Sequence, residues 1–163
     1  MIGELTMQRH QDLERHGIHH SHEEMEWFDV LPGEQIAYRI QGKDVNNEYS
    51  LFDLRMAAKQ GNGPIAIHHK ADEIFRIIEG EARFHIGGKE FNAGAGDVLV
   101  VPRGTPHAFL NIGDSHLHMS IMFTPPGDEL IFKEVHGKSM DEIIELAKKY
   151  EVSVVGPPIV YNK

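Results

Sequence analysis

Three side chains between residues 61 and 111 have the types and spacing of a metal-binding group: His68, Glu73 and His107. His68 and Glu73 are five residues apart, so both can face one cavity only if a turn or bulge separates two strand ends. His107 follows Pro-Arg-Gly-Thr-Pro at 102–106, which ends an apolar strand and redirects the chain. Two imidazoles and a carboxylate suit iron, manganese, nickel, copper or zinc, and leave coordination positions open for substrate and dioxygen.

The elements that must position these side chains are short strands separated by turns. Glycine-rich turns at 61–64, 87–88 and 92–97 divide runs rich in aliphatic and aromatic residues. Many short strands with regular turn spacing predict an all-β fold of the double-sheet jelly-roll type. The expected strands are 35–40, 49–56, 74–78, 82–86, 89–91, 98–101 and 116–123.

The spacing of a second set of residues resembles a known family. Gly96, Pro102, Gly104, His107 and Asn111 match the second motif of the cupins in full. The resemblance covers roughly residues 49–127 and is to a small single-domain cupin. It implies a double-stranded β-helix barrel, with His107 as a metal ligand.

The first cupin motif is matched in part. Family members usually have His-x-His, four residues, Glu, six residues and Gly, and this chain has Ala66, His68, Glu73 and Gly80 at those positions. The resemblance thus implies a three-ligand set of His68, Glu73 and His107. Features such as Phe-Thr-Pro-Pro-Gly at 123–127 resemble the quercetin-dioxygenase-like branch of the family.

Ala66 leaves one ligand position to be filled by water, by substrate or by a histidine from elsewhere. His69 does not qualify, because adjacent strand residues point to opposite faces. His85 and His118 lie in strand-like runs and are the candidates for such a histidine, but we favour a solvent-facing position for both. A histidine held by a carboxylate for packing alone is the structural alternative for the whole group.

Composition limits the class of protein. The chain has 163 residues, 40% of them hydrophobic, which suits one domain with extensions. Without cysteine it has no disulfide framework or thiol nucleophile, and its formal charge of −9 argues against nucleic acid as a partner. No apolar stretch is long enough for a membrane span and no signal-peptide pattern is visible, so we expect a cytoplasmic location.

The predicted organisation has three parts: an N-terminal arm at 1–29, the barrel at 30–127, and a C-terminal helical extension at 128–163. The arm contains His10, His16, His19, His20 and His22, a run that could chelate metal but is more typical of a solvated surface. In the extension, Ser139 and Glu142 predict a capping box at the start of a helix.

The resemblance and the expected cavity together suggest an oxidoreductase. We expect one divalent transition metal and a dioxygenase acting on a flavonol-like or other enolisable aromatic. Resemblance to quercetinases suggests that Glu73 also acts as a base on the substrate hydroxyl. Strand alternation makes Phe75, Ile77, Val100 and Phe109 the expected pocket walls.

Two other functions fit the sequence. One is a non-catalytic small-molecule-binding cupin with a degenerate metal site, and the other is a metal-assisted isomerase, cyclase or lyase. By analogy with cupins of this size, and because sheet edges need covering, we expect a homodimer.

Overall fold

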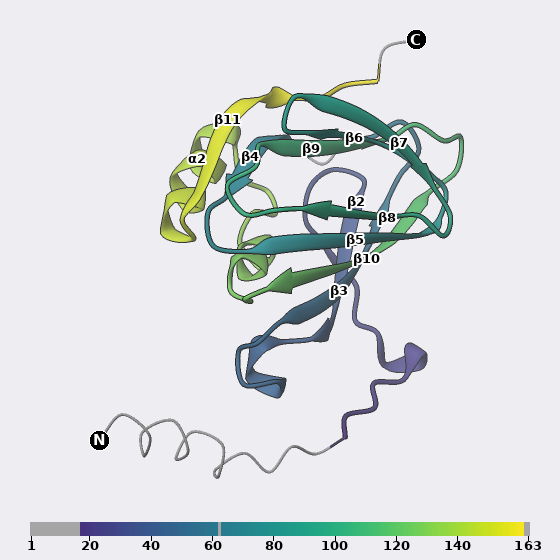
Figure 1. Cartoon of the computed structure of the whole chain (residues 1–163), viewed down its shortest axis with the longest axis vertical. Coiled ribbons are helices and arrows are strands. Elements are labelled where there is room, and N and C mark those ends of the chain that lie inside the picture. The colour runs from purple at the N-terminus through teal and green to yellow at the C-terminus, as the bar shows by residue number, and fades with distance from the viewer. Residues whose placement is uncertain (1–16, 62, 162–163) are drawn as a thin grey trace.

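Two antiparallel sheets face each other and enclose one core in the computed structural model, which describes residues 17–61 and 63–161 (Figure 1). One sheet has six strands in the order β1-β2-β3-β10-β5-β8, and the other has five in the order β11-β4-β9-β6-β7. The strands are β1 (Phe28–Asp29), β2 (Glu34–Ile40), β3 (Ser50–Met56), β4 (Pro64–His68), β5 (Asp72–Glu79), β6 (Glu81–Ile86), β7 (Lys89–Gly94), β8 (Val98–Val101), β9 (His107–Asn111), β10 (Leu117–Thr124) and β11 (Val152–Pro158). The helical elements are η2 (His22–Glu24), η3 (Gly42–Asp44), η4 (Asp128–Lys133) and α2 (Met140–Lys149).

Alternate side chains along the strands point inward and form the core. In β10, Leu117, Met119, Ile121 and Phe123 are buried, and the residues between them are partly exposed. The neighbouring strand β3 repeats this alternation. The expected jelly-roll fold is therefore confirmed, with one face of each sheet turned inward.

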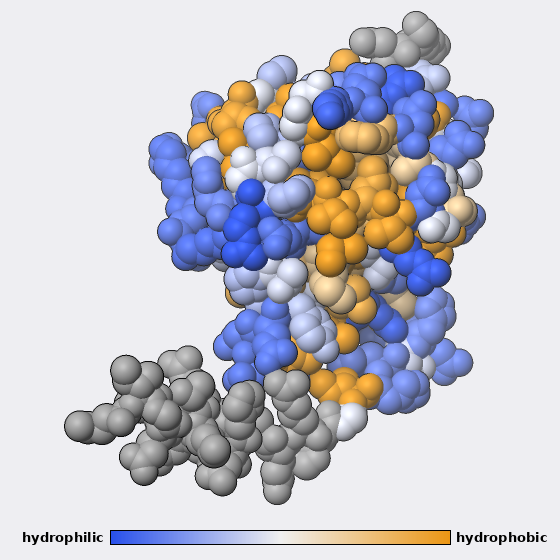
Figure 2. Space-filling model, viewed as in Figure 1, coloured by the Kyte–Doolittle hydropathy of each residue, from blue (hydrophilic) through white to orange (hydrophobic). Residues whose placement is uncertain are grey.

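The outer face of the six-stranded sheet carries apolar side chains in register. Leu51, Met122, Ile74 and Val100 are paired across β3, β10, β5 and β8, and we call these four residues the outer apolar row. Val100 is 55% exposed. Figure 2 shows this apolar area over β5 and β8.

The C-terminal segment closes the barrel with both helix and strand. Ser139 caps α2 through the predicted capping box: its hydroxyl oxygen accepts from the Glu142 N–H, and the Glu142 carboxylate accepts from the Ser139 N–H. After α2, β11 returns and pairs antiparallel with β4, placing Val152 opposite His68. The extension expected to be helical therefore also supplies an edge strand of the five-stranded sheet, and prolines at its end suit that edge position.

The N-terminal arm lies against the six-stranded sheet where it is described. Trp27 packs beneath the guanidinium of Arg55, whose Cζ is 4.1 Å from the ring centroid, and edge-on to His118. In residues 17–61 and 63–161 we find no helix of the length and apolarity needed to cross a membrane.

Candidate metal centre

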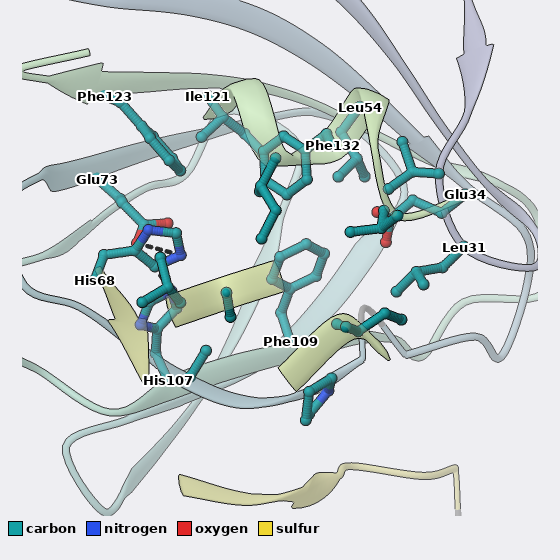
Figure 3. A pocket seen from close by; sticks show the side chains of 18 of the residues that line it. Leu31, Glu34, Leu54, His68, Glu73, His107, Phe109, Ile121, Phe123 and Phe132 are labelled. Atoms are coloured by element: carbon teal, nitrogen blue, oxygen red, sulfur yellow. Dashed lines mark ion pairs between the residues drawn. The ribbon is translucent and has the colours of Figure 1, made fainter. Parts of the chain in front are cut away.

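The three predicted ligands meet inside the barrel. His68 ends β4, Glu73 is the second residue of β5, and His107 begins β9. Their candidate ligand atoms all lie within 4.8 Å of one another, and all three residues are buried. Glu73 Oε1 is 3.1 Å from His107 Nε2 and 3.6 Å from His68 Nε2 (Figure 3). The arrangement is one that could hold a single metal ion.

The turn at 102–106 brings the two histidines together. Gly104 has φ +80°, which suits glycine, and its N–H donates to the carbonyl oxygen of His68 at 2.8 Å. The Arg103 guanidinium donates two hydrogen bonds to the Asp72 carboxylate, from Nε to Oδ1 at 3.0 Å and from Nη2 to Oδ2 at 3.1 Å. The turn before β9 is thus tied to both ends of the β4–β5 connection, which sets the position of His107 relative to the other ligands.

Both imidazoles are oriented by an acceptor on their far side. His68 Nδ1 is 3.0 Å from Asp128 Oδ2, and His107 Nδ1 is 3.0 Å from the carbonyl oxygen of Thr105. Since these partners only accept, each neutral ring carries its proton on Nδ1 and turns the lone pair of Nε2 toward Glu73. Metal-binding histidines are held by such contacts.

Charge at the centre is only partly compensated by protein. Glu73 Oε1 is buried without a partner in hydrogen-bond geometry among the described residues, although it contacts both imidazoles. Burial opposes the charged form of His107, but the Glu73 carboxylate and the Thr105 carbonyl outweigh it, so the His107 pKa is raised. A cation beside Glu73 would compensate the charge of this buried carboxylate.

The group opens into an apolar cavity of about 110 Å³. Phe75 and Phe109 line it, as predicted from strand alternation. Ile77 is buried in the core but is not among the lining residues. The prediction for Val100 was wrong: β8 pairs with β5 so that Val101 is opposite Glu73, which turns Val100 outward.

The remaining histidines lie elsewhere. Ala66 lines the cavity on the same strand as His68, while exposed His69 faces away, 2.7 Å from the hydroxyl of Ser153. His118 is bonded to Asp53 at 3.0 Å on the outer face of its sheet, and does not replace the missing ligand.

The sequence also suggests His85 as a candidate ligand and the histidine run of the arm as a possible separate metal chelator. His85 pairs with the exposed Glu90 at 2.9 Å, away from the centre. In the arm, His19, His20 and His22 are exposed, and His10 and His16 lie outside the described residues.

Two acidic residues of this region were missed in the sequence. Asp128 is 60 positions from His68, and no local spacing relates them. Glu34, which also lines the cavity, precedes a run of strand residues and looks there like an ordinary strand-end carboxylate. Only the folded arrangement brings Asp128, on η4, to His68 and brings Glu34, at the start of β2, to the cavity.

Fold and site together define a small jelly-roll protein with a buried His-Glu-His group. Residues 53–124 match the family model described as "Cupin domain". The chain is 32% identical over 85 residues to the "Oxalate-binding protein" of Thermotoga maritima, which covers 51% of this chain and 69% of that protein. The chain therefore belongs to the cupin family.

Other similar proteins agree on the fold. An uncharacterised protein of Methanocaldococcus jannaschii is 32% identical over 59 residues, 36% of this chain and 47% of that protein. The chain thus spans about half of that relative. The solved structure of KdgF from Halomonas sp. has a TM-score of 0.61 at 20% identity, and covers 71% of this chain and 99% of that one. Identity at this level shows the fold alone.

Proposed function

We propose that the protein is a metal-dependent cupin oxidoreductase, a dioxygenase acting on a small enolisable molecule. One observation carries the proposal: the buried Glu73 Oε1 lies 3.1 and 3.6 Å from two imidazole Nε2 atoms, and the Nδ1 atoms of both rings are held by acceptors. This donor set fits iron, manganese, nickel, copper or zinc. When bound, such a metal supplies Lewis acidity and, if redox-active, reactivity toward dioxygen.

The chain's own residues have defined tasks in this proposal. His68 and His107 would hold the ion from one sheet, and Glu73 would hold it from the other. Glu73 also lines the cavity, where the carboxylate oxygen that does not hold the ion would accept the proton from the substrate hydroxyl. Phe75, Phe109 and the other apolar walls keep bulk water away from the electron-rich substrate anion.

The cavity limits the size and polarity of the substrate. Among its lining residues there is no lysine or arginine, which disfavours a sugar phosphate. A volume of about 110 Å³ is below the roughly 150 Å³ of an engineered cavity that holds benzene. A flavonol exceeds this space unless the walls move. We therefore propose a compact enol or ketone in place of the flavonol expected from the sequence.

Metal content is the first test. Protein purified without a histidine tag should contain near-stoichiometric transition metal by elemental mass spectrometry, and His107→Ala should lose it. His118→Ala is the matched control, because that imidazole lies outside the barrel, and it should keep the metal. Equal metal in both variants would assign the ion to another place, and metal-free wild type after reconstitution would refute the proposal.

Dioxygen consumption is the second test. Metal-loaded protein should take up dioxygen with compact enolisable ketones, and His107→Ala should not. Turnover without dioxygen uptake would indicate a metal-assisted isomerase, cyclase or lyase.

A non-catalytic binding protein is the second candidate. It is favoured by the printed name of the Thermotoga relative, an oxalate-binding protein, and by Ala66 at a ligand position of the first motif. Tight binding of a small molecule with neither dioxygen uptake nor product would support this function.

We also propose that the chain acts as a homodimer. The outer apolar row ends on β8, which is the edge strand of the six-stranded sheet. Val98 and Ile78 lie on the neighbouring strands β8 and β5 and are also exposed, with 59% and 44% of their surface accessible. A second copy placing its own row there would cover both the apolar surface and the strand edge.

A further inference from the structure

A second polar group faces the cavity from the side opposite the candidate metal centre. Glu34 begins β2 and lines the same cavity as His68 and Glu73. In Figure 3 its carboxyl group points into the cavity, across from the His-Glu-His group, with Leu31, Leu54 and Phe132 around it. A molecule that fills this cavity lies between the two polar groups.

Glu34 is buried without compensation. Its residue surface is 4% exposed, and its Oε2 atom has no hydrogen-bond partner among the described residues. The cavity walls near it offer no cation, and burial raises the pKa of Glu34 to about 8. Burial without a nearby cation favours the protonated carboxylic acid, which can donate one hydrogen bond.

Packing alone does not account for a carboxyl group at this position. A leucine would fill the same wall at no polar cost, whereas an unpaired buried carboxyl destabilises the fold. Several walls of the cavity are already leucine, phenylalanine or isoleucine. The acid is explained if its partner is a molecule that enters the cavity.

We propose that Glu34 is a second ligand-binding residue, whose carboxyl group donates a hydrogen bond to an acceptor oxygen of the bound molecule. The inference rests on the proposed function for the other end of that molecule, which faces the metal. The substrate class is then a compact apolar molecule with two oxygen functions at opposite ends, one for the metal and one for Glu34.

Metal-free protein allows the contact to be tested apart from the metal. Cyclopentanone and methylenecyclopentane have the same shape, and only the ketone has an acceptor oxygen. Their dissociation constants can be measured by NMR titration for wild type, Glu34→Leu and Glu34→Gln. Ile121→Val is the matched control, since Ile121 lines the same cavity without a polar atom.

The affinity for cyclopentanone divided by that for methylenecyclopentane shows whether Glu34 donates a hydrogen bond to the ligand. It should be about tenfold higher in wild type than in Glu34→Leu, because the variant removes the only donor proposed for the ketone. Glu34→Gln retains an N–H donor and should keep most of the preference, and Ile121→Val should keep all of it.

Two results would overturn the inference. One is an equal ratio in wild type and Glu34→Leu, which would make Glu34 a structural residue. The other is failure of the ketone to bind wild type up to its solubility limit. Metal content is measured separately, so these results leave the test of the metal centre unaffected.

Discussion

Replacing Glu34 by glutamine should remove a specific part of the pH dependence of stability. In the folded protein the pKa of Glu34 is raised from 4.5 to about 8 by burial. Below pH 4.5 both the folded and the unfolded chain carry the proton, so the group has no effect. Between these values only the folded chain holds the proton, and the free energy of unfolding falls as the pH rises.

The magnitude follows from the two pKa values. Each pKa unit corresponds to about 1.4 kcal/mol, so the loss from pH 5 to pH 8 is about 3.5 kcal/mol. Glutamine has nearly the same shape and stays neutral. Glu34→Gln should therefore match wild type at pH 5 within about 1 kcal/mol and exceed it by about 3.5 kcal/mol at pH 8.

Urea unfolding at several pH values measures this difference directly. Other groups also titrate, but they contribute equally to both proteins and cancel in the comparison. Glu81→Gln is the control, because Glu81 is exposed on β6. Its free energy of unfolding should change with pH as that of wild type does. If the curves of wild type and Glu34→Gln are parallel from pH 5 to pH 8, Glu34 is not a buried neutral acid.

Three other changes test separate parts of the molecule. Asp128→Asn removes the carboxylate that orients His68 and should weaken metal affinity about 10- to 100-fold, measured by competition with a chelator. Asn111→Ala removes three hydrogen bonds to backbone carbonyls and should lower the free energy of unfolding by about 3 kcal/mol in urea, with a loss below about 1 kcal/mol contradicting that role. Val100→Glu should convert the proposed dimer to monomer in sedimentation velocity, whereas Val155→Glu, exposed on β11, should leave it intact.

The ligands could be predicted from sequence because their spacing reflects local backbone geometry. Gly104 has a positive φ and Asn111 ties the end of β9 to the backbone near Met56, so both motif residues have a structural task close to His107. Such tasks restrict residue type at fixed positions along one segment. A pattern of this kind is visible without knowledge of the fold.

Contacts between distant segments could not be predicted in the same way. The error at Val100 arose because strand alternation says which residues share a face, and the register of β8 against β5 decides which face is inside. Asp128 reaches His68 through the position of η4, and Glu34 reaches the cavity from β2. β11 pairs with a strand more than 80 residues earlier. No short pattern records these long-range contacts.

The three ligands are distributed over both layers of the barrel. His68 and His107 belong to the five-stranded sheet, and Glu73 belongs to the six-stranded sheet. An ion held by all three would therefore act as a cross-link through the core, in addition to its chemical role. At a free metal concentration a hundredfold above the dissociation constant, binding to the folded state alone adds about 2.7 kcal/mol to stability. The supply of metal would then control how much folded protein is present as well as how active it is.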